Sequence, residues 1–288
     1  MSVTQIIKSC LGGVLGSQLV YRMTDRRLNR PKMPFVRAVN YHDTPQKLAS
    51  NFSTQLEWYS SHFSNCNYSQ LRNLLENGAW DSPKPGLIIS FDDGLRSNYE
   101  IATPLLEEFG FTGWFMVPAA LLETDSAGHE EFAVTNTIIH QGLHANALGL
   151  SWDDVRDLER RGHVITCHSM NHRRLSDSLS DEQLHEEIVR SKSLMESRLG
   201  HPVTGFTWVG GEEFSYSRRA FNTMLQANYS EIFCTNNEPI VARQNPLFLE
   251  RSNIEAHFSM NQVRLVLGGL YDRKYAAKRQ RVFNLLTA

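Results

Sequence analysis

Two adjacent carboxylates, Asp92 and Asp93, stand where an apolar stretch gives way to a glycine and then to a helical pattern. Residues 87–91 have the length and composition of a buried strand, and Gly94 supplies the turn. Ligands of α/β proteins bind at the carboxyl ends of parallel strands, so both acids should reach the functional edge of the sheet. Neighbouring carboxylates repel each other. A bound cation relieves that repulsion if one acid ligates it and leaves the other to handle protons.

Two histidines, His168 and His172, follow a second predicted strand at 163–167. Imidazoles four residues apart can face the same way from a helical turn or a tight loop. With one carboxylate they make a His₂Asp set that leaves positions open for water, which is the layout of a hydrolytic metal site. His140 and His144 have the same spacing without a preceding strand, and we interpret that pair as a surface or lid feature.

The elements that must position these groups alternate between strand and helix patterns. Strands are predicted at 35–41, 87–91, 112–117 and 163–167, and helices at 46–62, 69–76, 96–109, 151–161 and 180–199. Such a β-α-β succession argues for a parallel α/β architecture rather than a sandwich, and 288 residues suffice for one large domain.

The composition excludes some partners. Lys and Arg number 29 against 31 Asp and Glu, and the net charge of -2 offers no electrostatic footprint for nucleic acid. A neutral or weakly charged substrate fits better. Four scattered cysteines without a CxxC pair favour a reduced, cytoplasmic location. Nothing in the sequence indicates an oligomeric state.

The two motifs resemble those of a known family. The stretch 89–94 (Ile-Ser-Phe-Asp-Asp-Gly) resembles the first motif of the polysaccharide deacetylase family, the NodB homology domain of carbohydrate esterase family 4, and 168–172 (His-Ser-Met-Asn-His) resembles its second. The pattern from Trp152 to 165 and the helix ending at Gly200 also resemble the family. The resemblance covers about residues 36–255, and the chain is identified as a divergent member.

The resemblance implies a distorted (β/α) barrel with fewer than eight regular strands, a divalent metal, usually Zn²⁺, and hydrolysis of an acetyl group on an N-acetylated or O-acetylated polysaccharide, oligosaccharide or glycan precursor. It implies Asp93, His168 and His172 as metal ligands and Asp92 as the general base. A metal lowers the pKa of its bound water from about 15.7 to about 7 and polarises a carbonyl. Asp92 would take the proton of that water.

The third motif departs from the family. The matching place is 206–211 (Phe-Thr-Trp-Val-Gly-Gly), where the family's arginine and proline are missing. That arginine orients the catalytic aspartate, and Arg251, in the strand-like segment 249–254, is the candidate substitute. Trp208 is either a core residue or a wall against a sugar ring.

Further candidates complete the predicted site. Trp208, Gly210, Arg251 and His42 are predicted substrate contacts. For the general acid, His257 lies in the right part of the chain, and His42, at the end of the first strand, is the other candidate.

The sequence pattern also divides the chain. Residues 1–33 are predicted to be an N-terminal helical arm, too short in its apolar part to span a bilayer, with peripheral membrane contact as the alternative. A single barrel domain follows at 34–270, with an insertion at about 123–150. The tail 271–288 is basic, and we interpret its charged run as a solvated helix face.

Two other functions stay open at this stage. The altered third motif allows a non-catalytic carbohydrate-binding protein that keeps the barrel. The same metal site could also hydrolyse a C–N amide that is not part of a sugar.

Overall fold

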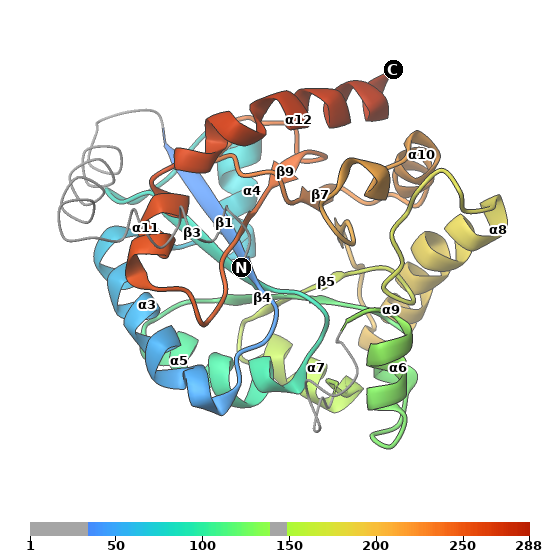
Figure 1. Ribbon diagram of the computed structural model, residues 1–288, viewed down its shortest axis with the longest axis horizontal. Helices are drawn as coiled ribbons and strands as arrows, with labels where there is room; N and C mark the ends of the chain where they lie inside the picture. The colour runs from blue at the N-terminus through green and yellow to red at the C-terminus, as the bar shows by residue number, and fades with distance from the viewer. Residues whose placement is uncertain (1–33, 139–148) are drawn as a thin grey trace, which may run out of the picture.

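The architecture is a curved sheet surrounded by helices (Figure 1). The computed structural model describes residues 34–138 and 149–288. The strands of the sheet run in the order β10-β1-β3-β4-β5-β6-β7-β9, and those in this path pair in parallel. The predicted α/β architecture is therefore confirmed, as is its barrel form.

The strands β1, β3, β4 and β5 lie close to the four predicted ranges, and β9 and β10 lie in the strand-like segment 249–254, whereas β2, β6, β7 and β8 were not predicted. The strands are β1 (Phe35–Tyr41), β2 (Ser64–Asn65), β3 (Gly86–Phe91), β4 (Gly113–Val117), β5 (Val164–Cys167), β6 (Gly205–Thr207), β7 (Glu231–Cys234), β8 (Ile240–Val241), β9 (Leu249–Glu250) and β10 (Ser252–Asn253). The helices of four or more residues are α3 (Ala49–His62), α4 (Tyr68–Asn77), η2 (Asn98–Ala102), α5 (Thr103–Glu108), α6 (His129–Thr135), α7 (Trp152–Arg160), α8 (Asp181–Leu184), η4 (His185–Arg190), α9 (Ser191–Leu199), α10 (Arg218–Gln226), α11 (Met260–Leu267) and α12 (Leu270–Thr287).

One short segment brings the two ends of the sheet together. β9 pairs with β7, whereas β10, two residues further on, pairs with β1. Arg251 lies between the two pairings, and its backbone N–H donates to Cys234 O at 3.0 Å. The barrel is thus nearly closed by a single segment whose central residue is an arginine.

Side chains alternate between the interior of the barrel and its helical coat. The interior contains an apolar cluster that includes Ala38, Ile88 and Trp114, together with leucines of α4. Asn40, Ser90 and Asp92 follow on the same faces of β1 and β3, one step nearer the carboxyl ends. The side chains that line the interior therefore change from apolar to polar near the carboxyl ends of the strands. The opposite faces pack in a second cluster against α3, α5 and the other outer helices.

Two predicted helix starts are confirmed at atomic detail. The hydroxyl of Ser151 accepts a hydrogen bond from the N–H of Asp154, and that of Ser180 accepts one from Gln183, each within a capping box. Ser180 begins a helix with a π-helical turn, η4, in its middle.

The insertion contains a helix, α6, in its first half. Residues 139–148, which include His140 and His144, lie outside the described residues. The N-terminal arm, 1–33, also lies outside them. In the part of the chain that the structure describes, no helix is long and apolar enough to cross a membrane.

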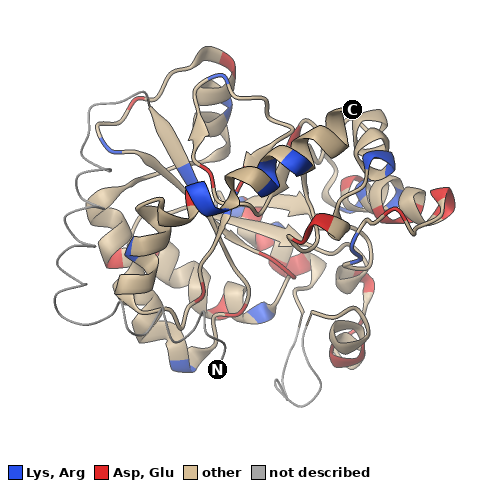
Figure 2. Ribbon diagram, turned by 45° about the horizontal axis from the view of Figure 1, so that its top comes forward, with Lys and Arg blue, Asp and Glu red and all other residues tan. Residues whose placement is uncertain are grey.

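The C-terminal tail is a helix, α12, whose basic face is solvated in part: Arg273, Lys274 and Arg281 are exposed, whereas Lys278 and Arg279 are half-buried. Lys278 donates to Gly211 O, Arg279 donates to Asn236 O and Asn237 O at 3.0 and 2.9 Å, and Arg281 pairs with Glu213. Figure 2 shows these blue segments of α12 lying across the barrel. The cations of α12 therefore bond loop carbonyls and a carboxylate of the barrel. These contacts join residues far apart in the sequence, so a local pattern could not predict them.

Candidate metal centre and active site

The turn after β3 holds both carboxylates in place. The N–H of Asp92 donates to Tyr41 O at 2.9 Å, which continues the ladder between β3 and β1. Asp93 has a left-handed backbone, with φ at 74°, and Gly94 follows with φ at 67°. A Cβ at Gly94 would lie 2.9 Å from the Cγ1 of Val117, so glycine is required there. Both acids are 4% exposed.

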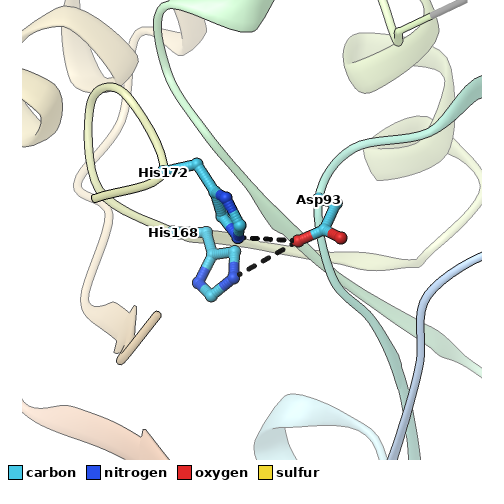
Figure 3. Close-up of side chains that lie close together, drawn as sticks. All are labelled: Asp93, His168 and His172. Atoms are coloured by element: carbon cyan, nitrogen blue, oxygen red, sulfur yellow. Dashed lines mark ion pairs between the residues drawn. The ribbon is translucent and has the colours of Figure 1, made fainter. Parts of the chain in front are cut away.

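Asp93, His168 and His172 converge (Figure 3). The Oδ1 of Asp93 lies 3.0 Å from the Nε2 of His172 and 3.6 Å from the Nε2 of His168. One ligand atom from each residue lies within 4.8 Å of the others, so the three could hold a metal ion. Residues 75 positions apart in sequence are joined because β3 and β5 both end at the same rim of the barrel.

The hydrogen bonds on the far side of each imidazole set its orientation. The Nδ1 of His168 lies 3.0 Å from Thr207 O, and that of His172 lies 2.9 Å from Asn136 O. A carbonyl oxygen only accepts, so each Nδ1 carries the proton and each Nε2 is directed toward Asp93. Asn136 belongs to the insertion, which therefore helps to orient a candidate ligand.

This donor set fits a cation. The Oδ1 of Asp93 is buried and has no hydrogen-bond partner among the described residues. A carboxylate oxygen and an imidazole lone pair 3.0 Å apart repel each other unless a proton or a metal ion lies between them. Burial raises the pKa of Asp93, but the neighbouring His172 and His168 outweigh it and hold the pKa well below its usual value.

A buried carboxylate fixes the loop that carries the histidines. The Oε2 of Glu187 accepts hydrogen bonds from the N–H groups of Met170 and Asn171, at 3.1 and 2.8 Å, and its Oε1 accepts one from the Asn171 amide at 3.0 Å. The loop needs this support because His172 has a left-handed backbone, with φ at 53°.

Asp92 is held by an arginine from the closing segment. The guanidinium of Arg251 donates to both carboxylate oxygens of Asp92, at 2.5 and 2.8 Å, and to Ser90 Oγ at 2.9 Å. Burial raises the pKa of Asp92, but the charges of Arg251 and His168 and the hydrogen bonds of Arg251 more than offset it, so the pKa is lowered. Asp92 is thus an ionised carboxylate at neutral pH, next to the three candidate ligands.

His42 faces the same pocket. Its Nδ1 lies 2.6 Å from Oε1 of Glu255, and its side chain is 40% exposed. Burial lowers the pKa of His42, whereas the hydrogen bond to Glu255 and the charges of Asp93, Glu255 and Asp92 raise it, to about 10. The carboxylate of Glu255 therefore favours the protonated form of the ring.

These groups line one cavity of about 290 Å³. Its wall also contains Thr137 and Ile138 of the insertion, and Gly210 from the third motif. Gly210 has φ at 77°, and a Cβ there would lie 2.9 Å from Ser215 Oγ. The full lining is Asn40, His42, Asp92, Asp93, Thr137, Ile138, His168, His172, Arg174, Val209, Gly210, Gly211, Glu212, Thr235 and Asn253. We refer to it as the catalytic pocket.

Three predicted site residues lie elsewhere. Trp208 is 1% exposed and packs against Tyr216 with ring centroids 5.1 Å apart, so it is a core residue and not a wall for a sugar. Arg251 is fully buried against Asp92 and cannot contact substrate. His257 is exposed beside Phe258, four residues after β10 ends, and does not line the pocket.

Sequence reasoning missed several polar residues of this region. Asn40 donates to Asp92 at 3.4 Å, and its place at the end of an apolar strand could have revealed it. Glu187 lies three positions after Leu184 on a predicted buried face, which is an unusual place for an acid. Glu255 has no local signal, since only the tertiary contact with His42 gives it a role.

Fold and site together define an α/β-barrel protein with a side-chain group that could hold a metal at the carboxyl ends of its strands. The sequence profile of the polysaccharide deacetylase family matches residues 80–232, more than half of the chain. The chain therefore belongs to the polysaccharide deacetylase family, and the resemblance drawn from its motifs is confirmed.

Solved structures share the fold. A Streptococcus pyogenes deacetylase, PplD, in complex with acetate has a TM-score of 0.64 at 18% identity, over 82% of this chain and 99% of that chain. A de-N-acetylase from Aggregatibacter actinomycetemcomitans has a TM-score of 0.63 at 17% sequence identity, over 80% of this chain and 98% of that chain. IcaB from Ammonifex degensii has a TM-score of 0.60 at 15% sequence identity, over 82% of this chain and 97% of that chain. A search of curated protein sequences finds no match.

Proposed function

We propose that this chain is a metal-dependent deacetylase that hydrolyses the acetamido group of an N-acetylated glycan or glycan precursor. The observation that carries the proposal is the convergence of Asp93, His168 and His172 beside a separate, ionised Asp92. The membership of the family and the fold shared with a de-N-acetylase support the same reaction.

In this proposal Asp93, His168 and His172 hold a divalent cation, with zinc as the expected ion. His₂Asp sets suit zinc, although imidazole and carboxylate ligands also serve other divalent ions. When bound, the ion supplies positive charge that polarises the acetyl carbonyl and lowers the pKa of water.

The remaining chemistry belongs to side chains of the pocket. Asp92, held ionised by Arg251, accepts the proton of the attacking water. His42 replaces His257 as the proposed proton donor to the leaving amine, because it lines the pocket and Glu255 fixes its ring. Gly210 would let the acetylated sugar approach the wall closely.

The alternative of a non-catalytic binding protein rests on the missing third-motif arginine. Arg251, which lies between β9 and β10, supplies a cation to Asp92, so the missing arginine is a weaker reason to expect an inactive protein. No observation favours an amide outside a sugar.

The test combines metal content with acetate release. Wild-type protein should bind about one zinc per chain and release acetate from N-acetylchitooligosaccharides, whereas Asp93→Ala should do neither. Asp153→Ala is the matched control, since Asp153 is a surface acid whose side chain is 92% exposed. Acetate release by Asp93→Ala would refute the mechanism. A metal-loaded wild-type protein that binds glycans without turnover of any acetylated substrate would favour the binding protein.

A further inference from the structure

A second recess adjoins the catalytic pocket. It has a volume of about 300 Å³, and Thr235 and Asn253 line both cavities. Glu255, which lines the recess, also bonds His42 of the catalytic pocket. The two cavities therefore adjoin each other across Thr235 and Asn253, with Glu255 between the recess and His42.

The recess is built from the C-terminal part of the chain. Its other walls come from α11, α12 and the segments before them, and every lining residue follows the family match that ends at residue 232. Figure 1 shows α11 and α12 (both red) beside β1 and β9. The full lining is Thr235, Asn237, Asn253, Glu255, Phe258, Gln262, Val266, Tyr271, Lys274 and Tyr275. We refer to it as the α12 recess.

Its lining combines rings with amides. Phe258, Tyr271 and Tyr275 supply aromatic surface, and Asn237, Asn253 and Gln262 supply hydrogen-bonding groups. A pyranose has the matching character, with C–H faces that pack on rings and hydroxyls at its edge that bond amides.

The floor of the recess is held firmly. The N–H of Asn237 donates to Arg251 O at 3.0 Å, and Arg279 of α12 donates to Asn237 O at 2.9 Å. The recess therefore takes its shape from the same segment that orients Asp92, which keeps the two cavities in fixed relation.

The charges of the recess favour an uncharged sugar. Lys274 and Glu255 are the ionisable residues of its lining other than tyrosine. Glu255 is already paired with His42, whereas Lys274 lies 5.6 Å from the ring of Tyr271 and 5.8 Å from that of Tyr275 and has no carboxylate partner among the described residues. A free amine on the bound unit would be repelled by Lys274, and an N-acetyl group would not.

We propose that the α12 recess binds the saccharide unit next to the one that is deacetylated, and that it prefers an N-acetylated unit to one with a free amine. The inference rests on the proposed function, since it makes the substrate an oligosaccharide or polysaccharide rather than a monosaccharide.

The first experiment measures kcat/KM for acetate release from N-acetylchitooligosaccharides of one to five units. Wild-type protein should gain activity as the chain grows, and Tyr275→Ala should lose about three- to tenfold on the longer substrates with little change on the monosaccharide. Tyr275→Phe keeps the ring and should retain the gain. Equal losses on all lengths in Tyr275→Ala, or no gain with length in wild type, would overturn the proposal.

The second experiment tests the charge. Lys274→Ala should accept a tetrasaccharide with a free amine next to the reacting unit about two- to fivefold better than wild type does at low salt. Arg273→Ala is the matched control, because Arg273 is the neighbouring exposed cation on α12 and does not line the recess. Identical behaviour of the two variants would refute the role of Lys274.

Direct binding separates this inference from the proposed function. Calorimetry with N-acetylchitotetraose reports on the recess without turnover. If wild type binds the tetrasaccharide, and Tyr275→Ala binds it more weakly, the recess stands even when no acetate is released. If acetate is released but Tyr275→Ala binds as wild type does, the recess is refuted and the proposed function stands. A wild-type protein that neither binds nor deacetylates would refute both.

Discussion

Replacing Arg251 with methionine should damage both the stability of the protein and the pH range in which it works. The side chain is fully buried, and it donates to both oxygens of Asp92 and to Ser90 Oγ. Methionine preserves most of the volume and removes the charge. Asp92, which is 4% exposed, is then left in the barrel without its main cation.

The cost follows from that exposure. Removing one partner of a buried ion pair costs about 3–5 kcal/mol, because the remaining charge is neither solvated nor paired. Asn40 and His168 still face Asp92, so we expect about 3 kcal/mol rather than the upper end of that range. Arg251→Lys keeps a charge but not the two-point geometry, and it should cost less.

The sign of the pH dependence also reverses. In wild type the pKa of Asp92 is lowered, so its stabilising contribution is present above the unfolded pKa of about 3.9 and is lost as pH falls through the folded value. Without Arg251, burial raises the pKa instead. The variant therefore loses stability as pH rises from about 4 toward 7, and the acid limb of kcat/KM moves up by about one to three pH units.

Urea unfolding followed by circular dichroism at pH 5 and pH 7 measures the loss of stability. The pH dependence of acetate release measures the shift of the acid limb of kcat/KM. Arg37→Met is the control, since Arg37 is buried and makes a two-point pair with the half-buried Asp272, which does not line the pocket. It should lower stability without moving the acid limb.

A double variant decides the cause. If the cost of Arg251→Met is electrostatic, adding Asp92→Asn should restore more than half of the lost stability, because both charges are then gone. No recovery would refute the reasoning and would mean that Arg251 stabilises the protein by closing the barrel, independently of Asp92.

Three further predictions follow from the same geometry. Glu187→Gln should weaken zinc binding about 10- to 100-fold in a chelator competition, because the loop of the ligands loses its anionic acceptor; unchanged affinity would contradict it. Burial raises the pKa of Glu250 from 4.5 to about 7, so wild type should lose about 3 kcal/mol of stability as pH rises from about 4.5 to 7, and Glu250→Gln should flatten that slope in urea unfolding. Gly210→Ala should lower Tm by several degrees and raise KM, because the new Cβ lies 2.9 Å from neighbouring atoms and the positive φ is unfavourable for alanine. Gly110→Ala is the control: it has φ at 74° but open space around it, so its loss of Tm measures the effect of backbone strain alone.

Local sequence predicted the elements and the three candidate ligands. The apolar run before Asp92, the capping serines and the glycine stops depend on interactions within a few residues, so the pattern alone locates strands and helices. The strand ends located both carboxylates and both histidines, because parallel strands end at the same rim, and the resemblance to the deacetylase family singled out Asp93 as the ligand.

The prediction of substrate contacts was weaker, for a physical reason. The direction of a side chain after a strand depends on the turn that follows it, so Trp208 points into the core and His257 into solvent although both lie at the right place in the sequence. The role of Glu255 depends wholly on a contact with His42, 213 positions away.

The sequence by itself determined where the strands end and which acid and histidines stand at those ends, because these features are set by neighbours along the chain. Tertiary structure alone decided how Asp92 is compensated and what surrounds the pocket. Arg251 reaches Asp92 across 159 positions, since closing the barrel brings its first and last strands together, and α12 folds back over the rim because barrel carbonyls accept its cationic side chains.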